Sequence, residues 1–143
     1  MNIHQISVFL ENRTGQLAEI TGILAENHID LRAISIAETA DYGIVRMIVD
    51  NTDAATAILL NAGYILSTTW VQVIAVPNEP GGLASVLKAL AENSIAIEYM
   101  YSLFTHGDHK AYMVFRVSEE DKFVSLMASL GVAVIPAGEL GIR

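Results

Sequence analysis

The sequence predicts an α+β fold built from two similar units, and three features indicate this. The segment L-E-N-R-T-G-Q-L at residues 10–17 returns as V-P-N-E-P-G-G-L at residues 76–83. From Gly15 and Gly81 onward, eight of 17 aligned positions are identical. Each copy then shows the same succession of strand-like and helix-like patterns. Repetition at a fixed spacing is typical of a duplicated structural unit.

Each copy is expected to contain a strand, a helix, two strands, a helix and a last strand. Runs of β-branched and apolar residues predict the strands of the first copy at Ile3–Leu10, Leu31–Glu38, Gly43–Asp50 and Tyr64–Thr69. The strands of the second copy are expected at Trp70–Val76, Ile97–Phe104, Lys110–Val117 and Val132–Pro136. Hairpins at Thr39–Tyr42 and at His106-Gly107-Asp108 join the middle strands of the two copies.

Apolar residues at helical spacing predict two helices in each copy. The apolar positions are Leu17, Ile20, Leu24, Ala55, Ile58, Leu59 and Ala62 in the first copy, and Leu83, Val86, Leu87, Leu90, Phe123, Leu126, Met127 and Leu130 in the second. The first helix of each copy ends at Ala-Glu-Asn, and we expect Asn27 and Asn93 to close it in the left-handed conformation. Ser118 is expected to open the last helix in a capping box, with Asp121 in place of the usual Glu.

The order β-α-β-β-α-β, found twice, is the ferredoxin-like pattern, with an antiparallel four-stranded sheet and both helices on one face. The other face or a sheet edge is expected to meet the other copy or another chain. We expect two domains, residues 1–70 and 71–143, packed side by side. No linker is expected between them, because Tyr64 to Val76 is almost continuously strand-like.

Composition excludes several classes of function. The 143 residues are 52% hydrophobic and 17% charged, with a net charge of −8. The eight basic residues are scattered, which argues against nucleic acid because phosphate contacts dominate that affinity. The absence of cysteine excludes disulfides, thiolate metal sites and a cysteine nucleophile.

The sequence also argues against a membrane or secreted protein. The stretch from Ala54 to Asn78 carries no charged residue and is long enough to span a membrane. Polar residues and Gly63 interrupt it, so we expect a helix followed by strands. No signal peptide is recognisable at the N-terminus. We therefore expect a cytoplasmic protein.

No motif for catalysis is present: His-Glu-x-x-His, Gly-x-Ser-x-Gly and a Walker loop are all missing from the sequence. We expect no enzyme activity and no cofactor. His106 and His109 flank a turn, but a third and a fourth ligand are not evident, so no metal is expected.

The repeated Asn-x-x-Gly turn is the strongest candidate site. The start of a helix favours anions, because its first N–H groups are unpaired and its dipole is positive there. Glycine allows a ligand close to the backbone, and asparagine can cap a helix or contact a polar ligand. The alternative is a purely structural turn, which Pro80 at an early helical position favours.

Asp30, at the start of the second strand, is expected beside the open end of the first turn. Its equivalent is Ala96, so two sites built in this way cannot be chemically equal. The alternative for Asp30 is an ordinary polar residue between a loop and a strand.

Two such units, each with Asn-x-x-(Pro/Thr)-Gly-x-Leu between its first strand and first helix, resemble a tandem pair of ACT domains. The turn Pro77–Leu83 matches the family closely, whereas Glu11–Leu17 has Thr14 in place of the usual Pro. The resemblance covers essentially the whole chain. It implies a stand-alone regulatory module, a homodimer that binds a free amino acid at an interface between ACT domains. It also implies signalling through a change in association, either with another copy of the chain or with a partner protein that the module regulates.

The resemblance also implies which residues contact the ligand. They are Asn12, Gly15 and Asp30 in the first copy and Asn78 and Gly81 in the second, with Arg13, Thr14, Gln16, Leu17, Glu79, Pro80, Gly82 and Leu83 as neighbours. We expect the ligand carboxylate to meet N–H groups at a helix start and its ammonium to meet Asn and Asp30. The alternative function is an interaction or scaffold module that has lost ligand binding, which Ala96 favours.

Overall fold

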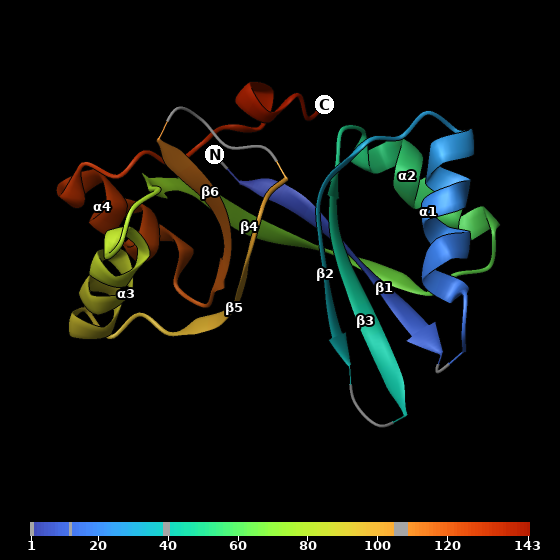
Figure 1. The fold of residues 1–143 in the computed structure, drawn as a ribbon, viewed down its shortest axis with the longest axis horizontal. Helices are drawn as coiled ribbons and strands as arrows, with labels where there is room; N and C mark the ends of the chain where they lie inside the picture. Colours follow the sequence, from blue (N-terminus) through green and yellow to red (C-terminus); the bar gives the residue numbers. More distant parts are fainter. Residues whose placement is uncertain (1, 12, 39–40, 105–108) are drawn as a thin grey trace. The chain divides into compact units, whose positions relative to one another are not determined.

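Both copies of the repeat fold in the predicted order of strands and helices (Figure 1). The structure, a computed structural model, describes residues 2–11, 13–38, 41–104 and 109–143. It divides into an N-terminal unit, His4–Thr69 with Leu140–Arg143, and a C-terminal unit, Met1–Ile3 with Trp70–Glu139. The start of the chain therefore belongs to the C-terminal unit, and its last four residues belong to the N-terminal unit. A division at residue 70 does not describe this exchange of the two ends.

The N-terminal unit contains an antiparallel sheet covered by two helices. Its elements are β1 (Ile3–Glu11), α1 (Gln16–Glu26), β2 (Leu31–Glu38), β3 (Tyr42–Val49), α2 (Thr52–Asn61) and the first residues of β4 (Leu66–Pro77). Strand β3 lies between β1 and β2 and is antiparallel to both. The backbone N–H of Phe9 donates to the carbonyl of Ile65 at 2.9 Å, which ties β1 to the start of β4.

The C-terminal unit repeats this arrangement with a shorter last strand. Its elements are the rest of β4, α3 (Gly82–Glu92), β5 (Ile97–Ser102), β6 (Lys110–Val117), α4 (Glu120–Leu130) and the 3-10 helix η1 (Ala137–Leu140). Strand β6 lies between β4 and β5. The strand predicted at Val132–Pro136 is reduced to one bridge between Val134 and Ile74 and two flanking hydrogen bonds. Pro136 has no N–H to continue the ladder, and the chain turns into η1 directly after it.

Strand β4 carries the chain from one unit to the other without a linker, as predicted. Its 12 residues run from Leu66 to Pro77. The uncharged stretch Ala54–Asn78 is thus a helix followed by a strand, which confirms that prediction. Within the described ranges, no helix is both long and apolar enough to cross a membrane.

Each unit buries its own core between its sheet and its two helices. In the N-terminal unit, alternate residues of β1 and β3 face the helices, with a helical period on α1 and α2: Ile6, Val8, Leu10, Ile20, Leu24, Val45, Met47, Val49, Ala55 and Leu59. In the C-terminal unit the corresponding set is Ile74, Val76, Val86, Leu90, Phe115, Val117, Phe123 and Met127. Eight of the 15 apolar positions from which the helices were predicted belong to these sets, so periodicity locates both cores. Two of the others, Ala62 and Leu130 at the ends of the second helices, are exposed.

The ends of two helices differ from the prediction. Asn27 and Asn93 are not left-handed: their φ angles are both −101°. The next residues, His28 and Ser94, adopt the left-handed conformation, with φ of 57° and 56°. Each asparagine instead donates its side-chain N–H to a carbonyl one turn back, Ile23 at 2.9 Å and Ala89 at 2.8 Å. In both copies this asparagine therefore bonds twice to the same carbonyl, through its side chain and through its backbone N–H at 3.3 Å and 3.1 Å.

The predicted capping box at Ser118 is wrong. The residue that precedes α4 is Glu119, and no side chain caps that helix start. Ser118 stands one position too early, so its hydroxyl is not at the cap. In the N-terminal unit the equivalent helix does have a side-chain cap, because Asn51 accepts from the N–H of Ala54 at 3.2 Å. The hairpin residues 39–40 and 105–108 lie outside the described residues.

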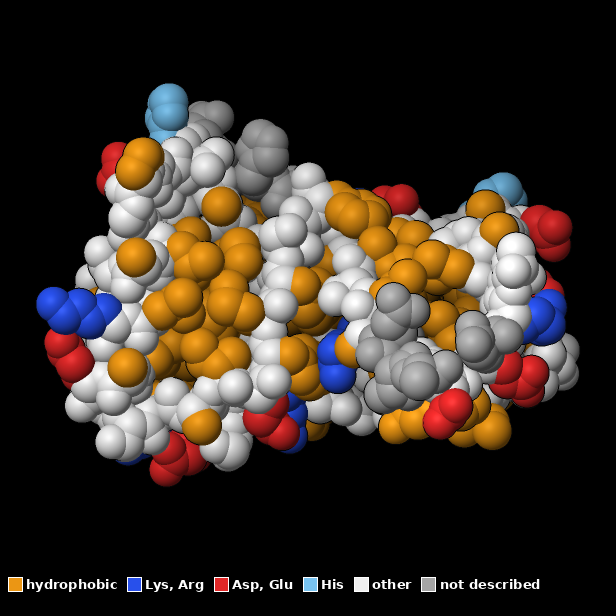
Figure 2. Space-filling model, turned by 60° about the horizontal axis from the view of Figure 1, so that its bottom comes forward, with side chains coloured by type: hydrophobic (Ala, Val, Ile, Leu, Met, Phe, Trp, Pro, Cys, Tyr) orange, Lys and Arg blue, Asp and Glu red, His pale blue; other side chains and the backbone are white. Residues whose placement is uncertain are grey.

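Apolar side chains remain on the surface of both units (Figure 2). In the N-terminal unit, Phe9 and Tyr42 stack with their ring centroids 5.2 Å apart, and Ile65 is 72% exposed. Phe9 lies between the core residues Val8 and Leu10 along β1, so its side chain leaves the sheet on the face that α1 and α2 do not cover.

Replacing the glycine before α1 should destabilise the fold, whereas replacing the glycine inside it should not. Gly15 has φ of 86°, so Gly15→Ala should lower the free energy of unfolding by about 1–2 kcal/mol. Gly22 lies within α1 with open space around its Cα, so Gly22→Ala should raise that free energy by about 0.5–1 kcal/mol. Urea denaturation followed by circular dichroism measures both; equal shifts in the same direction would contradict this account of the turn.

Candidate functional site

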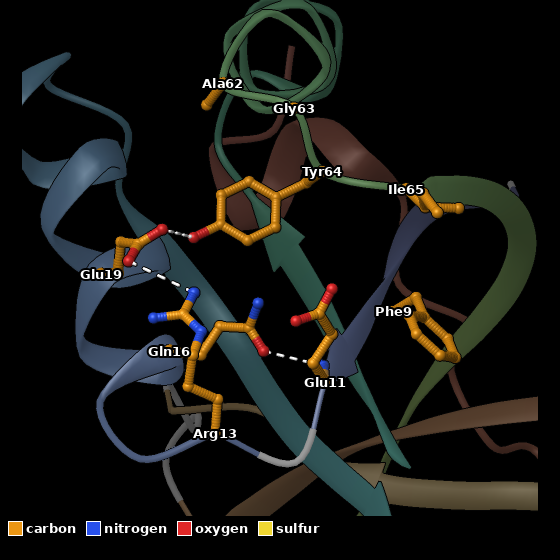
Figure 3. A pocket seen from close by; sticks show the side chains of 9 residues that line it. All are labelled: Phe9, Glu11, Arg13, Gln16, Glu19, Ala62, Gly63, Tyr64 and Ile65. Carbon is orange, nitrogen blue, oxygen red and sulfur yellow. Dashed lines mark hydrogen bonds and ion pairs between the residues drawn. The ribbon is translucent and has the colours of Figure 1, made fainter.

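A cavity of about 200 Å³ opens at the start of α1 in the N-terminal unit (Figure 3). We call it the N-pocket. It is formed by the end of β1, the turn and first residues of α1, and the segment that follows α2. Its lining residues are Phe9, Glu11, Arg13, Gln16, Glu19, Ala62, Gly63, Tyr64 and Ile65. Segments 50 residues apart along the chain meet here because the end of α2 lies beside the start of α1.

Two opposite charges stand side by side in the N-pocket. An Arg13 Nη atom lies 3.5 Å from a Glu19 carboxylate oxygen, and the other oxygen of Glu19 accepts from the Tyr64 hydroxyl (Figure 3). The side chains of Arg13 and Glu19 are 51% and 47% exposed. An ion pair this accessible to water contributes little to stability, so ligand charges can replace it at small cost.

The protonation states in this cluster follow from its contacts. Hydrogen bonding from Tyr64, assisted by the charge of Arg13, lowers the pKa of Glu19. Burial and then the neighbouring Glu19 carboxylate raise the pKa of Tyr64 to about 12. At neutral pH the N-pocket therefore contains a carboxylate, a guanidinium and a neutral phenol that donates its proton.

Gln16 fixes the geometry of the turn that leads into α1. Its side chain is buried, and its carbonyl oxygen accepts from the backbone N–H of Glu11 at 2.8 Å. The bond joins the last residue of β1 to the first residue of α1, as Figure 3 shows. It also satisfies a backbone donor that the end of the strand would otherwise leave unpaired.

The C-terminal unit has a cavity of about 380 Å³ at the equivalent place, which we call the C-pocket. It is lined by Pro77, Glu79, Pro80, Gly81, Gly82, Ser85, Val86, Leu130 and Val132. Both pockets therefore combine a strand end, a glycine turn, a helix start and the residues that follow the second helix of the unit.

The comparison with protein families agrees with this duplicated architecture. The sequence model of a family described as an ACT domain pair matches residues 1–134. The chain belongs to this family. Its ACT domains are the two βαββαβ units, and the α+β, ferredoxin-like fold class predicted from the sequence is confirmed.

Solved structures share this ACT fold. Protein BT0572 from Bacteroides thetaiotaomicron is 40% identical, with a TM-score of 0.91 over 99% of this chain and 96% of that one. The regulatory subunits of aspartate kinase from Thermus thermophilus and Thermus flavus are 15% and 14% identical. Their TM-scores are 0.63 and 0.65, over 88% and 92% of this chain and 91% and 92% of theirs. At such identities the likeness shows the fold alone. No protein of curated function matches the chain.

The two ACT turns place part of the predicted site residues in the pockets. Arg13 and Gln16 line the N-pocket. Glu79, Pro80, Gly81 and Gly82 line the C-pocket. Among the described residues, Thr14, Gly15 and Asn78 lie in the same turns, and Leu17 and Leu83 lie in the first turns of α1 and α3, but none of these five lines either cavity. Asn12 lies outside the described residues.

The expectation that Asp30 lies beside the first turn is wrong. Asp30 follows the C-terminal end of α1, and an 11-residue helix is about 16 Å long. There Asp30 pairs with Arg32, and its backbone N–H donates to the carboxylate of Asp50 at 3.0 Å. The prediction failed because the helix between the first two strands carries the chain back to the opposite end of the sheet.

Sequence analysis did not predict the pocket residues that lie outside the repeated turns. In the N-pocket these include Glu19 and Tyr64, and in the C-pocket Leu130 and Val132. Two signals in the sequence pointed to them. Glu19 lies one helical turn after Gln16, and Tyr64 follows Gly63, which aligns with Gly131 in the second copy.

Removing the Tyr64 hydroxyl should change the titration of Glu19. In Tyr64→Phe the carboxylate loses its strongest donor, so the pKa of Glu19 should rise toward its ordinary value of 4.5. Carboxyl-carbon NMR over an acid titration measures this, with Tyr112→Phe of the other unit as a control that leaves Glu19 unchanged. An unchanged Glu19 titration in Tyr64→Phe would contradict the assigned cause.

In the native protein the raised pKa of Tyr64 stabilises the folded unit below about pH 10, and this stabilisation is lost as the pH rises through about 12.

Proposed function

We propose that this ACT domain pair is a regulatory module that binds a free amino acid in the N-pocket. One observation carries the proposal: a guanidinium and a carboxylate stand 3.5 Å apart at the opening of a cavity beside a helix start. An α-amino acid carries one negative and one positive group on adjacent atoms, so it complements such a pair.

The orientation of the ligand follows from the charges. Its carboxylate contacts Arg13 and the first N–H groups of α1, which have no acceptor within the helix. Its ammonium contacts the carboxylates of Glu19 and Glu11, both of which line the cavity. Tyr64 holds Glu19 in place through its hydroxyl. Asp30 is left out of this site because it lies at the other end of α1.

The strength of such binding suits a metabolite sensor. Hydrogen bonds to charged groups contribute about 1.5–3 kcal/mol each. Three of them, less the cost of association, correspond to a dissociation constant between about 1 mM and 1 µM. Binding then acts by favouring one state of association, with a second copy or with a partner protein, over another.

The second candidate is an interaction module without a small-molecule ligand. The exposed apolar cluster of Phe9, Tyr42 and Ile65 favours it, because clustered apolar side chains on a surface are typical of protein contacts. A ligand screen separates the two candidates.

A thermal-shift screen of the full chain against the free amino acids tests the proposed function. A ligand at about 100 times its dissociation constant adds about 2.7 kcal/mol to stability. For a chain of this size we expect the midpoint to rise by roughly 5–10 °C. If no amino acid raises the midpoint, the sensor function is wrong and the interaction module becomes the better account.

Exchange of the guanidinium tests the site itself. Arg13→Gln should weaken the binding of the amino acid found in the screen at least about tenfold, because it removes one charged hydrogen bond. The matched control is Lys88→Gln, which removes the same charge from an exposed pair with Glu92 on α3. Isothermal titration calorimetry measures both, and equal affinities in the two variants would remove Arg13 from the site.

A further inference from the structure

The two pockets occupy equivalent places in the repeat but differ in chemistry. Glu19 in the N-pocket corresponds to Ser85 in the C-pocket, and Tyr64 corresponds to Val132. Ala62, a small residue, corresponds to Leu130. The carboxylate and the phenol that organise the N-pocket are thus replaced by a hydroxyl and an aliphatic side chain.

The backbone of the turn changes in step with the lining. In the N-pocket the Gln16 side chain fills the space beside β1 and satisfies the N–H of Glu11. In the C-pocket the equivalents are Gly82 and Pro77. Proline has no N–H to satisfy, and a Cβ on Gly82 would lie 2.0 Å from the carbonyl oxygen of Pro77. No side chain fits there, so the backbone itself forms this wall of the C-pocket.

The polar groups that remain in the C-pocket are few. The Ser85 hydroxyl donates to the carbonyl of Gly81 at 2.9 Å, so it is already engaged within the turn. Glu79 is the charged residue of the lining. The remaining side chains come from Pro77, Pro80, Val86, Leu130 and Val132, all aliphatic. Leu130 is 47% exposed, so an apolar group placed against it removes its surface from water.

We infer that the C-pocket binds the aliphatic side chain of a free amino acid, a ligand different from the one that the charged N-pocket selects. That the ligand is an amino acid rests on the proposed function. That the two pockets bind different ligands rests on the differences between their linings. Aliphatic walls favour an aliphatic group through burial of apolar surface, with about a fourfold gain in affinity for each added methylene that is fully buried. The chain then responds to two ligand classes through two copies of one fold.

Calorimetric titration of the full chain with glycine, alanine, valine and leucine tests the inference. Affinity should increase along this series by at least tenfold in total. In Leu130→Ala, leucine should bind about tenfold more weakly, whereas Arg13→Gln should leave leucine binding unchanged. The matched control in the other unit is Leu60→Ala, an exposed leucine of α2 that lines neither pocket, which should also leave leucine binding unchanged. Circular dichroism verifies that each variant is folded, and Leu130→Met replaces Leu130→Ala if the latter unfolds, with a loss of less than threefold expected.

The possible outcomes separate this inference from the proposed function. If another amino acid binds through Arg13 while leucine binds no better than glycine, the inference is wrong and the proposed function stands. If leucine binding depends on Arg13 and not on Leu130, leucine occupies the N-pocket and the inference is wrong. If Leu130→Ala changes only the sedimentation of the protein and not leucine binding, the C-pocket is a protein contact and the inference is again wrong. If no amino acid binds at all, both proposals fail.

Discussion

Both pockets depend on one constraint, the connection from a strand end to a helix start. This connection passes through a glycine in the left-handed conformation, which other residues rarely adopt. Gly15 and Gly81 share a φ of 86°, and neither helix has a side chain capping its start. The absence of a Cβ at this position leaves the first turn of each helix accessible, and the sharp change of direction brings it beside the end of the strand. The residues after the second helix of each unit then close the cavity, because the ferredoxin-like topology returns them to the same end of the sheet.

Each copy anchors this connection differently, and the difference accounts for the chemistry of its pocket. A buried glutamine that accepts from a backbone N–H serves one turn, and a proline beside a glycine serves the other. The two solutions exclude one another at each position, since Pro77 has no N–H to donate and Gly82 has no room for a side chain. A polar side chain at the base of the N-pocket accompanies a charged lining, whereas a bare backbone at the base of the C-pocket accompanies an aliphatic one. The repeat is thus preserved in fold and divergent in lining.

The fold was predictable from the sequence because its signals are local and occur twice. The apolar periods of α1 and α3 locate both cores, and the uncharged stretch around Gly63 reads correctly as a helix followed by a strand. A third of the pocket-lining residues was predictable for the same reason, since Arg13, Gln16 and Gly82, among others, belong to the repeated turn. Tyr64 was not, because its place beside Glu19 depends on how the end of α2 meets the start of α1. The left-handed residue was misplaced by one position, because the sequence does not distinguish an asparagine that bonds back to the helix from one that ends it.

Asp30 shows why topology, rather than residue type, decides which charged residues are available to a ligand. At the C-terminal end of α1, Asp30 pairs with Arg32, and Arg32 also donates to the carbonyl of Leu140 at 2.8 Å. The Arg143 N–H donates to the carbonyl of Asp50, also at 2.8 Å, so the last residues of the chain join this cluster. The Arg32 guanidinium thus already holds the C-terminal segment on the unit, and Asp30 is paired with it. At the other end of α1, Arg13 and Glu19 are about half exposed, and a cavity lies beside them. The same helix thus has one end engaged in structure and one end where ligand charges can replace a weak ion pair.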